Sequence, residues 1–128
     1  MEGTLTSGKK WASGTGTSGS AINNKFNYVS DATTSTRSIY YFDIKLTFTP
    51  SVIVVCTYND FYEHLSVYNK LGKNWKADNV KTSVYTGMSY SDTTTHNHSA
   101  DGKVVIGDNT YRIPVGISNR PLVWVAYE

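Results

Sequence analysis

The segment Arg37–Phe48 constrains the fold most, because hydrophobic and polar side chains alternate along it with a period of two. Aromatic or aliphatic residues occupy the even positions from Tyr40 onward, whereas Asp43 and Lys45 lie between them. Successive side chains of an extended chain point to opposite faces, so this period is typical of a half-buried strand. The segment therefore predicts a strand with Asp43 and Lys45 in solvent. Pro50 ends it, because proline cannot donate to a ladder.

Further strands are expected where β-branched and aromatic runs are separated by turn residues. These runs cover residues 9–17, 52–58, 62–69, 80–90, 103–106, 110–115 and 122–127. Residues 91–102 are expected to form a polar loop, and no stretch keeps the spacing of a helix. The expected fold is all-β, an antiparallel β-sandwich of jelly-roll-like or related topology. It would form a single domain over residues 9–128, after a flexible linker at residues 1–8.

The composition narrows the class of protein further. Aromatic residues make up 13% of the 128 residues, which is too many for a disordered chain. A formal net charge of +2 gives little attraction to nucleic acid, and no apolar run is long enough to enter a membrane as a helix. The single cysteine excludes an intrachain disulfide. The N-terminal residues lack the pattern of a signal peptide, so we expect the protein to fold in a reducing cytoplasm. The Gly-, Thr- and Ser-rich N-terminal stretch is typical of a segment that joins a domain to a longer chain.

Two of the expected strands, 52–58 and 122–127, are hydrophobic on both faces. One face of each strand in an isolated two-layer fold should meet water. Two interpretations remain open: another subunit covers the outward residues, or a loop or an aromatic side chain of the same chain does. Cys56 lies within the first of these strands, where we expect it to be a small buried side chain.

Three blocks of the sequence point to a family. They are Lys10–Thr15 (KWASGT), Leu46–Val54 (LTFTPSVIV) and, at the C-terminus, Val123–Glu128 (VWVAYE). Together with the Tyr-, Ser-, Thr- and Asn-rich stretches between them, these blocks resemble the C-terminal domain of tail-fibre or receptor-binding proteins of tailed phages and prophages of Gram-positive bacteria. The resemblance spans nearly the whole chain in order.

The resemblance implies a homotrimeric tip of an elongated fibre on the virion tail, joined to the rest of the fibre at its N-terminus. Such a tip contacts a cell-wall carbohydrate, for example teichoic acid, or a surface protein. The resemblance implies that the three blocks form the framework, with packing and turn roles for Trp11, Phe48, Pro50 and Trp124, and that the receptor surface lies in the loops. The resemblance carries over no catalytic residue.

Loop aromatics with neighbouring amides are the candidate ligand-binding residues. A sugar site needs a flat ring for stacking and planar groups for hydrogen bonds, and tyrosine combines a ring with a polar tip. The alternative is that these rings fill a small β core. The residues of this candidate site are Tyr58, Asn59, Asp60, Tyr62, Asn74 and Trp75.

His96-Asn97-His98 is a candidate metal site. Positions i and i+2 of an extended strand share a face, so two imidazoles there could bind one ion. Three protomers around an axis would supply six nitrogen ligands, which suits an octahedral transition metal such as iron. The alternative is a solvated loop with no metal and no cofactor.

Three functions follow from these observations. The first is a non-catalytic module that binds a bacterial surface glycan. The second is a structural domain that trimerises and caps the fibre. The third is an enzyme that cleaves wall polysaccharide, which needs two positioned carboxylates. Its candidate pairs, Asp60 with Glu63 and Asp92 with Asp101, lie in no recognisable motif, so we expect no catalysis.

Overall fold

A computed structural model describes the chain in segments, and every regular element in them is a β-strand. No helix is present among the described residues, and therefore none that is long and apolar enough to cross a membrane. The all-β expectation is confirmed. The described segments are residues 1–20, 25–29, 34–38, 40–58, 63–69, 84–86, 96–98, 104–115 and 117–128.

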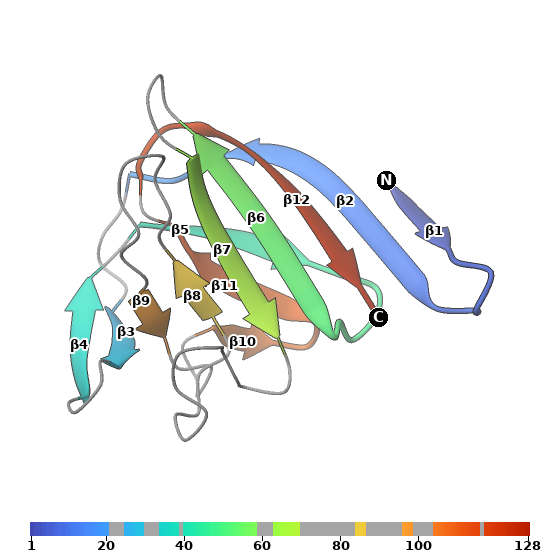
Figure 1. Ribbon diagram of the computed structural model, residues 1–128, viewed down its shortest axis with the longest axis horizontal. Coiled ribbons are helices and arrows are strands. Elements are labelled where there is room, and N and C mark those ends of the chain that lie inside the picture. Colours follow the sequence, from blue (N-terminus) through green and yellow to red (C-terminus); the bar gives the residue numbers. More distant parts are fainter. Residues whose placement is uncertain are drawn as a thin grey trace.

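The strands of the described residues form two sheets, and all paired neighbours run antiparallel (Figure 1). Across the larger sheet the order is β1 (Glu2–Thr4), β2 (Lys10–Thr17), β12 (Pro121–Tyr127), β6 (Val52–Tyr58), β7 (Glu63–Asn69), β8 (Val84–Thr86), β9 (His96–His98), β3 (Lys25–Val29) and β4 (Thr34–Ser38). Across the smaller sheet the order is β10 (Val105–Gly107), β11 (Thr110–Pro114) and β5 (Tyr41–Lys45).

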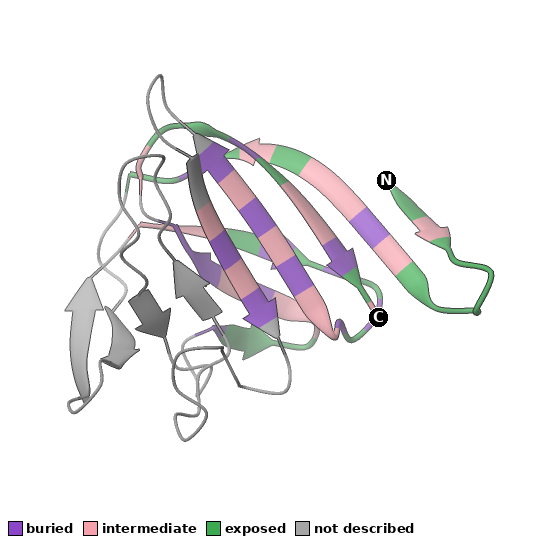
Figure 2. Ribbon diagram, viewed as in Figure 1, coloured by how far each residue is buried: buried purple, intermediate pink, exposed green. Residues whose placement is uncertain are grey.

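Side chains from both sheets meet in one hydrophobic core. Along β6 the side chains alternate, with Ile53 and Val55 completely buried and Val54 half-buried on the other face (Figure 2). The smaller sheet lies behind the larger one in Figure 1 and contributes its own inward residues to the same cluster. The buried hydrophobic residues are Ala12, Ile44, Leu46, Phe48, Ile53, Val55, Tyr68, Val104, Tyr111, Ile113, Val115, Leu122 and Ala126.

Two contacts tie β7 of the larger sheet to the smaller sheet. The hydroxyl of Ser66, which is 1% exposed, donates a 2.7 Å hydrogen bond to the carbonyl oxygen of Pro114 at the end of β11. The rings of Tyr68 and Tyr111 pack with their centroids 5.1 Å apart and their planes tilted by 54°. Because a buried polar group is costly unless it is bonded, the Ser66 bond fixes how these strands face one another.

The Tyr68–Tyr111 pair predicts a loss of stability in alkali. Burial raises the pKa of both phenols, and the neighbouring Tyr111 raises the pKa of Tyr68 further. The unfolded chain then loses these protons at a lower pH than the folded chain does. The free energy of unfolding should therefore hold below about pH 10 and fall above it. Urea titrations across this range should give a smaller fall for Tyr68→Phe than for the unaltered protein, and equal falls would contradict the assignment.

Glycines in β2 let aromatic rings lie against the strand on its inward side. A Cβ at Gly14 would sit 2.6 Å from the indole nitrogen of Trp124, and one at Gly16 would sit 2.5 Å from the ring of Phe42. Both distances are too short for real atoms, so only glycine fits under these rings. Phe42 belongs to the smaller sheet, and its position over Gly16 closes the space between the sheets at β2.

The expected strand over Arg37–Phe48 is wrong as a single element. Its first residues belong to β4 in the larger sheet, and Tyr41–Lys45 forms β5 in the smaller sheet. After Lys45 the ladder stops, because its partner Thr110 is the first residue of β11. The burial pattern nevertheless continues, since Leu46 and Phe48 are buried while Thr47 between them is exposed.

Most of the other expected strands are confirmed, with shorter bounds in places. β2, β6, β7, the β10–β11 hairpin and β12 lie where the sequence predicts them. In the hairpin, Asn109 takes a positive φ of 50°, which asparagine tolerates in a tight turn. Only 84–86 of the expected strand 80–90 is described, as β8.

Two strands arise where the sequence predicts other structure. Residues 2–4, within the expected linker 1–8, form β1 and pair with β2. Residues 96–98, within the expected loop 91–102, form β9 between β8 and β3, so the loop prediction is wrong there. The first correction follows from a partner that the local sequence does not reveal. The second follows from pairing with distant strands, which overrides the polar composition.

Candidate functional site

The predicted ligand-binding residues fall mainly outside the described residues. Asn59, Asp60, Tyr62, Asn74 and Trp75 all lie there. The structure does describe the backbone of Tyr58, which ends β6 and pairs with Glu63 at the start of β7. The segment 59–62 therefore connects two adjacent antiparallel strands.

That hairpin has a firmly packed base. Ile53 and Val55 of β6 are completely buried, and Ser66 and Tyr68 of β7 contact the smaller sheet. Binding residues commonly lie on loops that a rigid framework positions. The framework on either side of the segment 59–62 is of this kind.

The candidate metal pair has a described backbone. His96 pairs with Thr86 of β8, and His98 pairs with Val84 of β8 and with Tyr28 of β3. The two positions are two residues apart on one strand, as the metal hypothesis requires, and metal binding stays a prediction. Among the residues whose side chains are described, no three His, Cys, Asp or Glu side chains lie close enough together to hold an ion.

The strands that the sequence marks as hydrophobic on both faces, β12 and β6, are neighbours in the larger sheet and lie between β2 and β7. On their outward face, Val123 pairs with Cys56, Val125 with Val54, and Tyr127 with Val52. Val123 remains 48% exposed and Tyr127 40% exposed. We call this surface the outer apolar face, and its described side chains are Trp11, Val52, Val54, Cys56, Leu65, Val67, Val123, Val125 and Tyr127.

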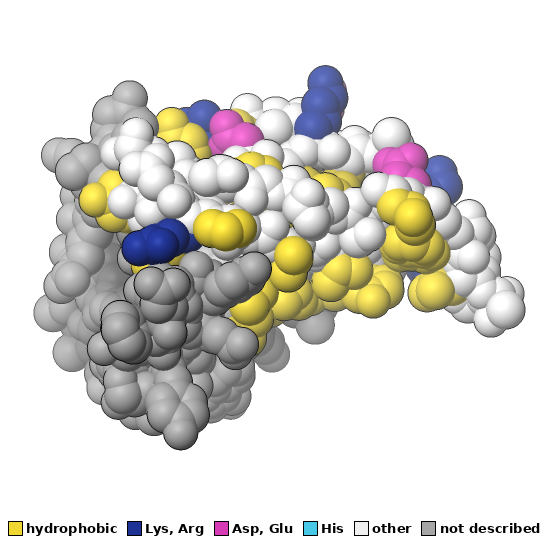
Figure 3. All heavy atoms as spheres, turned by 90° about the horizontal axis from the view of Figure 1, so that it is seen from above, with side chains coloured by type: hydrophobic (Ala, Val, Ile, Leu, Met, Phe, Trp, Pro, Cys, Tyr) yellow, Lys and Arg dark blue, Asp and Glu magenta, His cyan; other side chains and the backbone are white. Residues whose placement is uncertain are grey.

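The outer apolar face is visible as a band of hydrophobic side chains on one side of the molecule (Figure 3). Val54, Cys56, Val123 and Val125 line a shallow depression in it. Of the two interpretations that the sequence leaves open, coverage by a loop or a ring of the same chain is not seen among the described residues. Cys56 is half-buried on this face and not in the core, so the expectation of a buried thiol is wrong.

Trp11 marks the β1 side of the outer apolar face. Its indole lies against Gly3 of β1, at the position that a Cβ would take. A side chain at position 3 would clash with the Trp11 ring, so glycine is needed there for the ring to pack against the backbone. Trp11 is expected to have a framework role, and this packing of its indole against β1 is the contact through which it would act.

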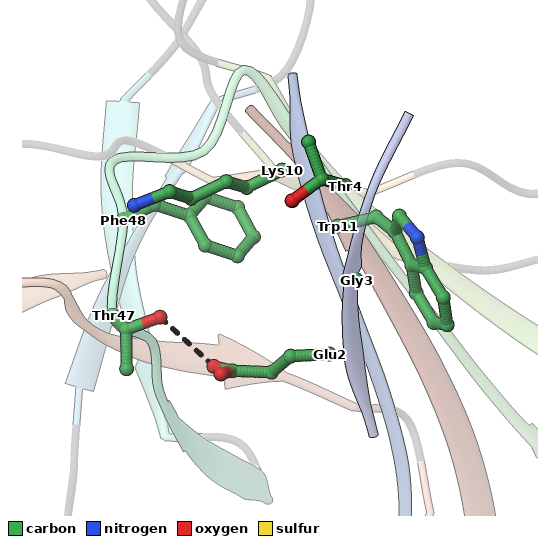
Figure 4. Close-up of a pocket in the computed structure, with 7 residues that line it drawn as sticks. All are labelled: Glu2, Gly3, Thr4, Lys10, Trp11, Thr47 and Phe48. Atoms are coloured by element: carbon green, nitrogen blue, oxygen red, sulfur yellow. Dashed lines mark hydrogen bonds between the residues drawn. The ribbon is translucent and has the colours of Figure 1, made fainter. Parts of the chain in front are cut away.

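A polar groove lies on the other side of β1 and β2 and was not foreseen from the sequence. It has a volume of about 250 Å³ and is lined by Glu2, Thr4, Lys10, Thr47 and Phe48, among others. Figure 4 shows Lys10 and Phe48 on the groove side and the Trp11 ring on the opposite side of the strands. The hydroxyl of Thr47 donates a 2.9 Å hydrogen bond to the carboxylate of Glu2. No sequence signal could have indicated this groove, because it needs β1 to pair with β2.

The exposed face of the smaller sheet carries an ion pair between Arg112 and Asp43. The guanidinium of Arg112 donates hydrogen bonds of 2.9 and 3.0 Å to the carboxylate of Asp43, and it lies 4.3 Å from the centre of the Tyr41 ring. The hydrogen bonds to Asp43 raise the pKa of Arg112. The sequence predicts Asp43 as a solvated charge. It is exposed, but its charge is paired with that of Arg112.

Comparison with known proteins adds nothing to this geometry. No protein-family model matches the chain, and neither the curated proteins nor the solved structures contain a significant match. The function must therefore be argued from the sequence and the structure.

Proposed function

We propose that this chain is a non-catalytic module that binds a bacterial surface glycan or teichoic acid, at the tip of a phage tail fibre. The observation that carries the proposal is the β6–β7 hairpin, in which Tyr58 pairs with Glu63 on a firmly packed base. The connection between these strands has the sequence Asn59-Asp60-Phe61-Tyr62, which offers rings for stacking and planar groups for hydrogen bonds.

The proposal includes the assembly and location of the module. Three copies form the tip, the N-terminal side joins the rest of the fibre, and the protein resides on the virion tail. Several weak sites on one trimer, and several fibres on one virion, would give firm attachment through avidity. The finer fold, a jelly-roll-like β-sandwich, belongs to the same proposal. Two sheets that share one core support it.

The proposed site predicts the effect of two substitutions on wall binding. Tyr62→Ala and Trp75→Ala should each weaken binding to purified Gram-positive cell walls by about tenfold or more, because aromatic anchors dominate binding energy. Co-sedimentation of the protein with walls measures this affinity. Thr47→Ala is the matched control, since Thr47 lies in the groove near the start of β6, and it should bind as the unaltered protein does. Equal affinities for all variants would contradict the proposed site.

The structural alternative, a domain that trimerises and caps the fibre, is favoured by one observation, the outer apolar face. In that case the trimer would persist and the walls would not retain it. Wall polysaccharide cleavage is tested in the same samples, because released reducing sugar would indicate an enzyme and none is expected.

A further inference from the structure

We propose that the outer apolar face is the surface on which copies of this chain assemble, with β6 and β12 at its centre. The inference rests on the homotrimer of the proposed function and is independent of wall binding. It names the strands through which the copies meet.

The first argument is the hydrophobic character of a face that should be polar. An antiparallel sheet that packs on one side usually exposes polar side chains on the other. Here the described outward side chains of β6 are Val52, Val54 and Cys56, and those of β12 include Val123 and Tyr127, which are 48% and 40% exposed. Continuous hydrophobic surface of this kind marks an interface.

The second argument concerns charge and identifies the occupant. The outward positions of β2, β6 and β12 are all uncharged, and Ser13, Thr15 and Thr17 of β2 give the face a polar margin. In β7 the charged residue at an outward register position is Glu63, at the start of the strand. An anionic wall polymer would lose hydration here without gaining a cationic partner. Over β6 and β12, a partner must instead present apolar and uncharged side chains.

A second copy of the chain presents such a surface by definition. Association of two or three identical faces through β6 and β12 would bury hydrophobic side chains against each other and desolvate no charge of these two strands, which is the arrangement common in homo-oligomers. The low formal net charge of +2 means that the copies repel each other little. The uncharged, hydrophobic surface of β6 and β12 therefore favours a copy of this chain over a glycan as the occupant.

Val123→Asp tests the proposal, because it places a charge at the most exposed of these positions. In sedimentation velocity at equal concentrations, the unaltered protein should have three times the 14.2 kDa of one chain, and Val123→Asp should have the mass of one chain. Val105→Asp is the matched control. Val105 is 39% exposed in the smaller sheet, so this variant should remain assembled.

Cys56 gives a second measurement that needs no substitution. It is the one cysteine of the chain and lies on the outer apolar face, so its reaction with a maleimide reports whether that face is covered. Labelling of the unaltered protein should become at least tenfold faster on dilution below the assembly range. It should be fast at all concentrations in Val123→Asp, whose folding is checked by circular dichroism.

The outcomes separate this inference from the proposed function. An assembled Val123→Asp, or fast labelling of Cys56 in an assembled unaltered protein, would overturn the interface but leave the trimer standing. An unaltered protein that stays monomeric would overturn both the interface and the trimer. A trimer that meets every expectation but does not bind walls would support this inference and contradict the wall-binding function.

Discussion

Replacing Ile53 by alanine is expected to lower the free energy of unfolding by about 3–4 kcal/mol. Ile53 is completely buried in β6, between Ala126 of β12 and Tyr68 of β7. Removal of its outer methyl and methylene groups loses their burial and leaves a cavity that neighbouring strands of a paired sheet cannot easily fill. Urea unfolding followed by tryptophan fluorescence measures the change, with all variants at one protein concentration because assembly would add to stability.

Val105→Ala is the control for this experiment. Val105 is 39% exposed at the edge of the smaller sheet, so its truncation should cost about 0.5 kcal/mol or less. If Val105→Ala were as destabilising as Ile53→Ala, the core would not lie between the two sheets as described. A small loss of unfolding free energy in Ile53→Ala would also show that the core does not lie between the two sheets.

Gly14→Val is expected to destabilise the protein by about 3 kcal/mol, although valine has a higher strand propensity than glycine. Even one added carbon at Gly14 would lie 2.6 Å from the Trp124 indole, which packs against the core. Valine adds three carbons at this point, so the ring must leave its place. The same urea titration measures the loss, and a change in tryptophan emission should accompany it.

Two further variants test whether the loss arises from the contact between Gly14 and Trp124. Thr15→Val changes the next residue of β2, which is exposed on the opposite face, and should leave the free energy of unfolding within about 0.5 kcal/mol of its original value. Trp124→Leu should cost much less in the Gly14→Val background than alone, because the two residues share one space. Strictly additive costs would contradict the contact between Gly14 and Trp124.

Local sequence predicts burial in this chain better than it predicts pairing. The even positions of the segment Tyr40–Phe48 are the more buried ones, as their alternation predicts, yet the strand ends at Lys45. The reason is that burial follows from the side chains of the segment itself. A ladder requires a partner, and here β11 begins at Thr110, opposite Lys45.

The runs that are hydrophobic on both faces were predictable as strands for a related reason. Val52–Tyr58 and the C-terminal strand β12 are rich in β-branched residues, which fit a strand whatever lies beside it. Which of the two faces is inward could not be predicted, and Cys56 was therefore assigned wrongly to the core. Only the register of β6 with its neighbours and the position of the smaller sheet decide this.

The contacts of the β2 glycines and of the polar strand β9 could not be predicted from the neighbouring sequence, because they depend on strands that are distant in the chain. The sequence places Gly14 and Gly16 within the expected strand 9–17, but it does not show that they accept rings from β12 and β5. His96–His98 has little tendency to form a strand by itself and becomes one between β8 and β3. For the candidate site, the sequence supplied the residue types, and the structure adds that Tyr58 and Glu63 pair on either side of the connection.

The most direct test of the account is the retention of the unaltered protein on purified Gram-positive cell walls, measured as the amount of wall is increased. A wall-binding tip module predicts saturable retention on walls of at least some strains. It also predicts that soluble glycan or teichoic acid released from the same walls competes for binding. Retention no greater than on walls of a Gram-negative bacterium, for every strain in a broad panel, would contradict the proposed function.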